Sequence, residues 1–309
     1  MLATLDRRCV YTTLIGRYEK LNEQPVARQS AIPFICLTDD PGLTSETWQV
    51  VRVTPLFEQD PVRSQRMLKL RPHRHLSGFD CSLYIDNSVA LIAPPEQIFS
   101  TYLSNASFAL PTHSFRASVR DEFEEVAACR LDDPERIADQ LVDYATADPD
   151  VLRERPYWSA VLLRDHRDAR VYETSEIWAA HVLRYSRRDQ LSANRAFRRS
   201  GFEPHRIEID NYASWFHRWP VTEGRRDDVR VYHSERAAKA RAETDRLTRE
   251  VNLQRDRAAD AEREAAKLQQ ETARLTQNLS DRTAYLEAIL RSRSWRLTAP
   301  LRSVRRWLR

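Results

Sequence analysis

The strongest constraint on the fold of this chain is a change of composition at about residue 235. From there to Pro300 the sequence has no proline or glycine, and alanine, arginine, glutamate, glutamine and leucine predominate. Positions at alternating spacings of three and four between residues 247 and 289 are mostly apolar, with Gln254, Thr272 and Arg282 as exceptions. A seven-residue repeat held this long predicts a coiled coil over residues 235–290. Because several positions of the repeat are only alanine, a single solvated helix is the alternative.

Residues 1–232 have a different pattern, in which short apolar runs alternate with stretches of helical spacing. The runs expected to form strands are 9–16, 33–39, 48–53, 82–86, 107–112, 159–165 and 205–210. Helices are expected over residues 60–76, 95–103 and 134–145, each with helix-start residues in front. This alternation predicts an α/β domain with a largely parallel sheet flanked by helices.

Composition limits the compartment and the partners. The four cysteines lie far apart with no C-x-x-C pair, which argues against a zinc site or a disulfide framework and favours a reducing compartment. No apolar run has the length of a membrane span, and the first residues lack the form of a signal peptide. We therefore expect a cytoplasmic protein. A net charge of only +4 and the lack of a nucleic-acid motif argue against nucleic acid as a partner.

Several kinds of active site are excluded by the shortage of glycine. The chain has five glycines, and neither G-x-x-x-x-G-K-[ST], G-x-G-x-x-G nor G-x-S-x-G occurs. Two polar clusters remain. Asp86, Asn87 and Ser88 follow the strand predicted at 82–86, at the end where open α/β sheets bind ligands, and residues 187–190 begin a predicted helix. Each cluster could instead be an ordinary turn or helix cap.

The order of these motifs resembles a glycosyltransferase-like family of bacteria and plants that was long catalogued as a domain of unknown function. The resemblance runs from about residue 8 to about residue 200 and is strongest at SLYIDNSV and SRRDQLS. Members carry a strand ending in Trp/Tyr-Ile-Asp and a later Arg-Asp-Gln, which residues 84–86 and 188–190 match. The resemblance implies a GT-A fold and transfer of a sugar from a nucleotide-sugar donor to a cell-surface polysaccharide or lipid-linked glycan.

The resemblance also implies roles for individual residues. Asp86 would hold a divalent cation, Mn²⁺ or Mg²⁺, against the donor diphosphate. GT-A enzymes generally carry a second aspartate two residues later, where this chain has Ser88, whose hydroxyl or a water would serve instead. Asp189 and Gln190 would be the catalytic residues beside the donor sugar. The other expected donor-binding residues are Thr12, Thr13, Tyr18, Asp39, Arg63, Arg66, Lys69 and Arg188, and the expected acceptor-side residues are His113, Arg116 and Glu122.

Arg63, Arg66 and Lys69 also suggest a route without a metal. They stand at i, i+3 and i+6 of a predicted helix, close to one face, and could neutralise the diphosphate in place of a cation. The alternative to an enzyme is a non-catalytic scaffold with a degenerate transferase fold that binds a glycan or a protein. The serine at position 88 is the best evidence for that alternative.

The C-terminal segment predicts where the protein resides. Residues 291–309 place Leu301, Val304 and Leu308 on one stripe among arginines and tryptophans. Such a helix suits an anionic membrane surface, so we expect peripheral association with the inner face of the cell membrane. A disordered basic tail is the alternative. The coiled coil in front of it is expected to form a homodimer.

Overall fold

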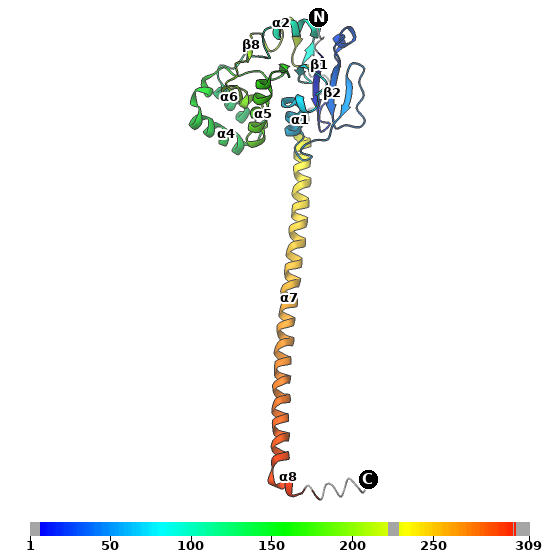
Figure 1. The fold of residues 1–309 in the computed structure, drawn as a ribbon, viewed down its shortest axis with the longest axis vertical. Helices are drawn as coiled ribbons and strands as arrows, with labels where there is room; N and C mark the ends of the chain where they lie inside the picture. The colour runs from blue at the N-terminus through cyan, green and yellow to red at the C-terminus, as the bar shows by residue number, and fades with distance from the viewer. Residues whose placement is uncertain (1–6, 222–228, 299, 301–309) are drawn as a thin grey trace. The chain divides into compact units, whose positions relative to one another are not determined.

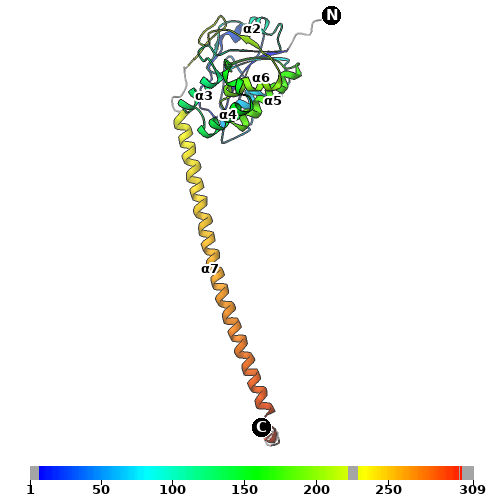
Figure 2. The ribbon, with the colours of Figure 1, turned by 90° about the vertical axis from the view of Figure 1, so that its left-hand side faces the viewer.

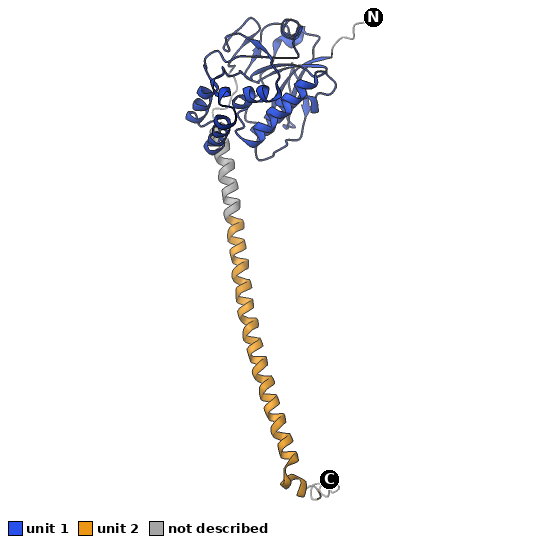
Figure 3. Cartoon of the chain, turned by 60° about the vertical axis from the view of Figure 1, so that its left-hand side comes forward, with its two compact units in different colours: residues 1–229 blue, residues 230–309 orange. Residues whose placement is uncertain are grey.

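The computed structural model describes residues 7–221, 229–298 and 300, with the backbone alone for 229–245. The chain divides into two compact units, residues 1–229 and residues 230–309 (Figure 3). The first unit holds an α/β domain and the second holds a long helix. Leu301, Val304 and Leu308, on which the predicted membrane stripe depends, lie outside the described residues.

The domain is built on a seven-stranded sheet in the order β3-β2-β1-β4-β7-β6-β8, in which β1 and β2 lie side by side (Figure 1). Its strands are β1 (Arg8–Leu14), β2 (Phe34–Thr38), β3 (Gln49–Arg52), β4 (Cys81–Ile85), β6 (Phe108–Pro111), β7 (Val161–Asp165) and β8 (His205–Ile207). A separate antiparallel pair joins β5 (Ala90–Leu91) to β9 (His217–Arg218). The prediction of an α/β fold with a mostly parallel sheet is therefore confirmed.

One strand runs against the others. β7 pairs antiparallel with both β4 and β6, whereas the remaining pairs of the large sheet are parallel. The amino end of β7 consequently lies at the same edge of the sheet as the carboxyl ends of β1, β4 and β6. The segments at these ends include residues 86–88, 112–116 and 158–160, so three distant parts of the sequence meet there.

Helices cover both faces of the sheet (Figure 2). They are α1 (Pro61–Leu70), α2 (Pro95–Tyr102), α3 (Val119–Ala128), α4 (Pro134–Ala147), α5 (Ala169–Arg184) and α6 (Gln190–Ser200). Alternate strand residues enter different cores, as the two-residue period of a strand requires. Tyr84 packs with Leu68 and Trp178 of α1 and α5, whereas Leu83 packs with Phe99 of α2.

The helix predicted over residues 60–76 is shorter than expected. It ends at Leu70, and a 3-10 turn at Pro72–Arg74 follows. Proline has no N–H to continue the helical hydrogen bonds, and it disfavours a helical conformation of the residue before it, here Arg71. All four cysteines lie in the described part of the chain, and none of them forms a disulfide bond there.

The second unit contains α7 (Val229–Arg291) and α8 (Arg293–Leu297). The side chains of α7 that the structure describes are almost all exposed, including Leu268, Leu275, Leu279 and Leu286 of the apolar repeat. Among the described residues, no helix has the length and apolar character needed to cross a membrane. The long helix is as predicted, and its repeat is an apolar stripe along an otherwise polar surface.

Candidate functional site

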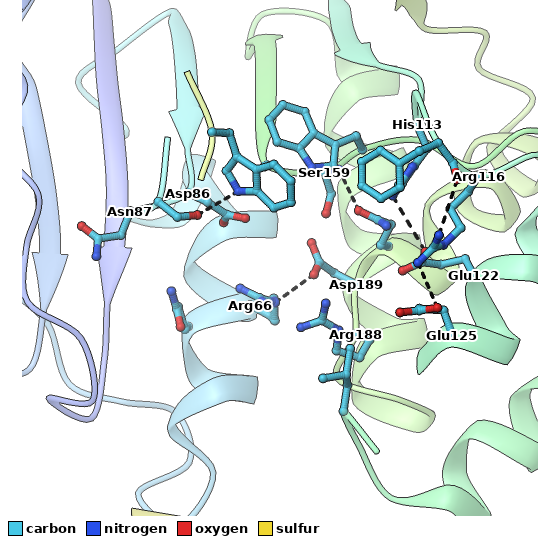
Figure 4. Close-up of a pocket in the computed structure, with 18 of the residues that line it drawn as sticks. Arg66, Asp86, Asn87, His113, Arg116, Glu122, Glu125, Ser159, Arg188 and Asp189 are labelled. Atoms are coloured by element: carbon cyan, nitrogen blue, oxygen red, sulfur yellow. Dashed lines mark hydrogen bonds and ion pairs between the residues drawn. The ribbon is translucent and has the colours of Figure 1, made fainter. Parts of the chain in front are cut away.

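A cleft of about 280 Å³ lies at the sheet edge where these strand ends meet. Its walls come from the loops after β1, β4 and β6, the segment just before β7, helices α1 and α3, and the start of α6 (Figure 4). Most of the residues in it were named in the sequence analysis. These are Tyr18, Arg66, Asp86, Asn87, Ser88, His113, Arg116, Glu122, Arg188, Asp189 and Gln190.

Asp86 is placed by β4, whose five residues are all buried. Its backbone N–H donates to the carbonyl of Ala160 at 2.8 Å, which fixes the strand end beside the start of β7. The hydroxyl of Tyr84 donates to Asp86 Oδ1 at 2.5 Å. Burial, and then the Asp86 charge, raise the pKa of Tyr84 well above its usual value, so the phenol keeps the proton that it donates.

Asp189 occupies the N-cap position of α6 but makes no capping hydrogen bond with its side chain. Its carboxylate instead pairs with Arg66 Nε at 2.8 Å and with Lys69 Nζ at 2.7 Å. The same Lys69 Nζ lies 3.6 Å from Asp86 Oδ1. Two motifs a hundred residues apart in sequence therefore meet at one buried ammonium group, and the helix-cap interpretation of Asp189 is wrong for its side chain.

These ion pairs fix the charge of Asp189. Burial by itself would raise its pKa, but Lys69 and Arg66 outweigh burial and hold the pKa well below the usual value. Asp189 is therefore ionised at any physiological pH. It serves to hold Arg66 and Lys69, and a carboxylate so strongly paired is a poor proton acceptor.

The opposite side of the cleft carries a second carboxylate with different properties (Figure 4). Glu122 of α3 lies 3.5 Å from Arg116 Nε and 3.9 Å from His113 Nε2. Burial raises the pKa of Glu122, although Arg188 and Arg116 oppose the shift. Burial and the nearby Arg116 lower the pKa of His113 to about 4, so this imidazole is neutral at neutral pH. Of Asp189 and Glu122, Glu122 is thus the carboxylate better suited to accept a proton.

Five predicted donor-binding residues do not line the cleft, namely Thr12, Thr13, Asp39, Arg63 and Lys69. Thr12 and Thr13 are fully buried inside β1. Asp39 accepts a hydrogen bond from the backbone N–H of Gly16 at 3.0 Å and so closes the turn after β1. Arg63 donates to main-chain carbonyls at the end of α5, including that of Tyr185 at 3.2 Å. Six residues along a helix rotate a side chain by about 120°, so Arg63 and Lys69 cannot share one face.

Lys69 itself lies behind the cleft wall. Its side chain is buried, and its ammonium also donates to Ser159 Oγ at 3.2 Å. It acts on the cleft through the two aspartates that it joins.

Three aromatic residues of the cleft, Phe115, Trp158 and Trp219, were not predicted from the sequence. Trp158 comes to this edge only because β7 is antiparallel, and the apolar pattern of a strand does not give its direction. Trp219 follows β9 and donates its indole N–H to Ser88 Oγ at 3.1 Å. No motif marked either residue.

The residues fit a divalent cation that arrives with a phosphate ligand. Among the described residues there is no group of three or more His, Cys, Asp or Glu placed to enclose a metal. Mg²⁺, however, is commonly held by one or two carboxylates plus substrate phosphates, and Asp86 supplies one carboxylate. The cleft lining also has more acidic than basic side chains. The acidic ones are Glu19, Asp86, Glu122, Glu125 and Asp189, and the basic ones are Arg66, Arg116 and Arg188.

Comparisons with known proteins agree with the motifs. The family model described as "TOD1/MUCI70, glycosyltransferase-like domain" matches residues 37–209. A curated relative, the "Probable hexosyltransferase MUCI70" of Arabidopsis thaliana, is 32% identical over 155 residues, which are 47% of this chain and 26% of that protein. The chain thus spans about a quarter of the length of this relative.

A search of solved structures found a bifunctional glycosyltransferase, WbbM, in its apo form. It aligns with a TM-score of 0.40 and 7% identity, covering 68% of this chain and 40% of that chain. The matched family segment, residues 37–209, includes both Asp86 and Asp189 and more than half of the chain. The chain therefore belongs to the TOD1/MUCI70 glycosyltransferase-like domain family.

Proposed function

We propose that this protein transfers a hexosyl or pentosyl group from a nucleotide-sugar donor to a cell-surface polysaccharide or a lipid-linked glycan. The observation that carries the proposal is the joining of Asp86 and Asp189 by Lys69 in one cleft at the carboxyl ends of the parallel strands. Ligands bind at this edge in open α/β sheets. A relative described as a probable hexosyltransferase supports the same class of reaction.

In this proposal the two sides of the cleft have different tasks. The donor diphosphate lies beside Asp86, which would hold Mn²⁺ or Mg²⁺, with Ser88 contributing directly or through water. Such a cation would supply positive charge to the departing diphosphate. Arg66 and Arg188 line the same cleft and add positive charge there. Asp189 orients Arg66 and Lys69, and Gln190 accepts a hydrogen bond from the backbone N–H of Ser159 at 3.4 Å, which ties α6 to the start of β7.

The reaction breaks the bond between the anomeric carbon and the diphosphate oxygen and forms one between that carbon and an acceptor hydroxyl oxygen. The electron pair of the broken bond leaves with the nucleoside diphosphate. The proton of the acceptor hydroxyl must go to a base. Glu122, across the cleft from Asp86, is the group that we assign to this task (Figure 4).

The first test is donor binding. The whole chain is heated with each of a panel of nucleotide sugars, in Mn²⁺, in Mg²⁺ or in EDTA, and its melting temperature is recorded. A ligand at a hundred times its dissociation constant adds about 2.7 kcal/mol of stability, which is a shift of several degrees. We expect one nucleotide class to stabilise the protein, and to do so less in EDTA. No stabilisation by any donor would favour the scaffold alternative.

The second test is catalysis with the donor so identified. Asp86→Asn should leave the fold intact, since Lys69 keeps Asp189 as its nearer partner, and should lose at least about a hundredfold in turnover, the scale of removing one preorganised charge contact. Release of nucleoside diphosphate measures turnover. The matched control is Asp150→Asn, an exposed aspartate paired with Arg153 on the surface. Turnover of Asp86→Asn equal to that of the control would remove Asp86 from the site.

Two further parts of the proposal concern the oligomeric state of the protein and its location in the cell. We propose that the apolar stripe of α7 joins two copies of the chain in a coiled coil. We also propose that residues 291–309 hold the protein at the inner face of the cell membrane. Support for the first is the exposure of the stripe in a single chain, since an exposed apolar row marks an interaction surface. Support for the second is the arginine and tryptophan content of the tail.

A further inference from the structure

Four aromatic side chains form a continuous row, of which Trp158, Trp219 and Phe115 line the cleft and Tyr212 lies exposed beside it. Trp158 and Trp219 both line the cleft, with ring centroids 5.5 Å apart. Trp219 lies 5.5 Å from Tyr212, and Tyr212 stacks on Phe115 at 5.1 Å with an interplanar angle of 21°. Phe115 is 39% exposed and Tyr212 is 50% exposed, whereas Trp158 is buried. We call these four residues the aromatic row.

The loops that carry the aromatic row are held together by the buried Asn211. Its Oδ1 accepts from the backbone N–H of Ser114 at 2.7 Å, and its Nδ2 donates to the carbonyl of Thr112 at 3.0 Å. Beyond the row, the N–H of Val221 donates to the carbonyl of Ser88 at 2.8 Å. The segment that carries Tyr212 and Trp219 is therefore anchored on both sides, at Asn211 and at Val221. The rings are in place before a ligand arrives, which lowers the entropy that binding would cost.

The Phe115 end of the aromatic row lies next to the acceptor side of the cleft. Phe115 lies 4.3 Å from the ring of His113, and His113 lies 3.9 Å from Glu122. The Arg116 guanidinium is 5.3 Å from the centroid of Phe115 and also pairs with Glu125 at 3.1 Å. Apolar ring surface and charged hydrogen-bonding groups thus occur together, across the cleft from Asp86 (Figure 4).

This combination matches the chemistry of a sugar chain. A pyranose ring has C–H groups on its faces and hydroxyls around its rim, so it packs against aromatic rings while its rim needs polar partners. Aromatic side chains offer large, rigid apolar surface of this kind. A contiguous exposed aromatic surface that continues a polar cleft marks a binding site more often than solvent-facing residues scattered singly.

We propose that the aromatic row is a subsite for the acceptor, and that it holds the inner sugar units of an oligosaccharide or polysaccharide chain whose end reaches Glu122. The inference rests on the proposed transferase function and narrows its acceptor to a glycan of several units. A free monosaccharide or a lipid-linked single sugar at Glu122 would leave Tyr212, which lies outside the cleft lining, unused.

The test is binding of the whole chain to an array of defined oligosaccharides of one to six units, followed by calorimetry with the best-bound ones. Affinity should rise from one unit to three or more. Tyr212→Ala and Phe115→Leu should each weaken that binding by about tenfold, the scale of losing a stacked aromatic contact. Tyr212→Trp should retain it. The matched control is Tyr172→Ala, because Tyr172 is 49% exposed on α5 and its ring contacts His73 outside the cleft.

The outcomes separate this inference from the function on which it rests. Wild-type protein that binds no oligosaccharide, or Tyr212→Ala that binds as the wild type does, would overturn the subsite. Stabilisation by a nucleotide sugar, measured on the same samples, should be unchanged in Tyr212→Ala. If a donor stabilises the wild type but no glycan binds, the transferase proposal stands and the subsite is wrong. If no donor stabilises it, the transferase proposal itself fails.

Discussion

The Lys69 ammonium is shielded from solvent and lies within 3.6 Å of two carboxylates from different parts of the sequence. Asp189 is the nearer of the two at 2.7 Å and also pairs with Arg66, so removing its charge takes the close partner from two buried cations, and removing one member of a buried pair typically costs about 3–5 kcal/mol. We therefore expect Asp189→Asn to lower the free energy of unfolding by about 3 kcal/mol. Urea denaturation measures this loss.

The control for this experiment is Asp150→Asn, since both Asp150 and Arg153 are largely exposed. An exposed pair contributes less than about 1 kcal/mol, so the control should change little. A loss for Asp189→Asn no larger than that of the control would show that Lys69 and Arg66 find other partners.

Glu122 should make stability depend on pH in the opposite sense to a salt-bridged carboxylate. Because its pKa is raised in the folded protein, the native state holds a proton that the unfolded state has released between the usual pKa of 4.5 and the raised value. Its contribution to stability therefore falls as pH rises through that range. Glu122→Gln cannot ionise, so its free energy of unfolding relative to the wild type should increase from pH 4 to pH 7.

Urea denaturation of both proteins at several pH values checks this. Glu125→Gln is the matched control, because Glu125 lies on the same helix, is more exposed, and also pairs with Arg116. A difference between Glu122→Gln and the wild type that is constant with pH would mean that Glu122 is not held in its protonated form by burial.

At the scale of single residues, the sequence predicted which kinds of side chain the cleft contains better than which individual side chains point into it. Arg66 and Arg63 are equally basic and three residues apart, yet one pairs with Asp189 and the other binds carbonyls at the end of α5. Thr12 and Thr13 were expected to bind the donor, but both lie within β1 and are fully buried. Where a strand ends and how a helix is rotated depend on packing partners distant in sequence, which a local pattern does not contain.

At the scale of the secondary-structure elements, the sequence of α7 suggests that it pairs with the same helix of a second copy of the chain. Its heptad positions are exposed in the single chain, and burying leucines at such positions drives coiled-coil pairing. Leu275→Asp should dissociate the homodimer. Ala284→Asp, on the outward side of the same repeat, should leave it intact. Light scattering after gel filtration gives the mass of each, and a wild-type protein that is monomeric at micromolar concentration would contradict the proposal.

The positions of the strands in the sequence were predicted more closely than their arrangement in the sheet. The run 82–86 matches β4 almost residue for residue, because alternation of apolar residues marks a strand directly. The reversed β7 was not predicted, although it delivers Trp158 and Ser159 to the cleft. Helix α5 was also missed, since it buries Thr174, Ser175 and His181, which weaken the apolar pattern of its inner face.

For the whole molecule, we expect the basic tail to attach the protein to anionic membranes. Arg302, Arg305, Arg306 and Arg309 lie in the tail, and each basic residue near an anionic surface contributes about 1 kcal/mol. Deleting residues 299–309 should therefore weaken co-sedimentation with phosphatidylglycerol vesicles by roughly a thousandfold. Added salt should weaken binding of the full chain, and neutral phosphatidylcholine vesicles should not bind it. Equal binding to both kinds of vesicle would refute an electrostatic anchor.

The anchoring of Val221 has a practical consequence for anyone who handles this protein in pieces. Its hydrogen bond to the carbonyl of Ser88 lies two residues from Asp86 along the chain. A shortened protein that ends before Val221 would release the loop that carries the candidate cation ligand, so loss of activity on truncation there would say nothing about the long helix. Because Val221 lies close to the proposed donor site, a probe at this position could report donor binding. An environment-sensitive dye placed at position 221 should change its emission when a donor fills the cleft, which would allow ligand screening by fluorescence without a labelled sugar.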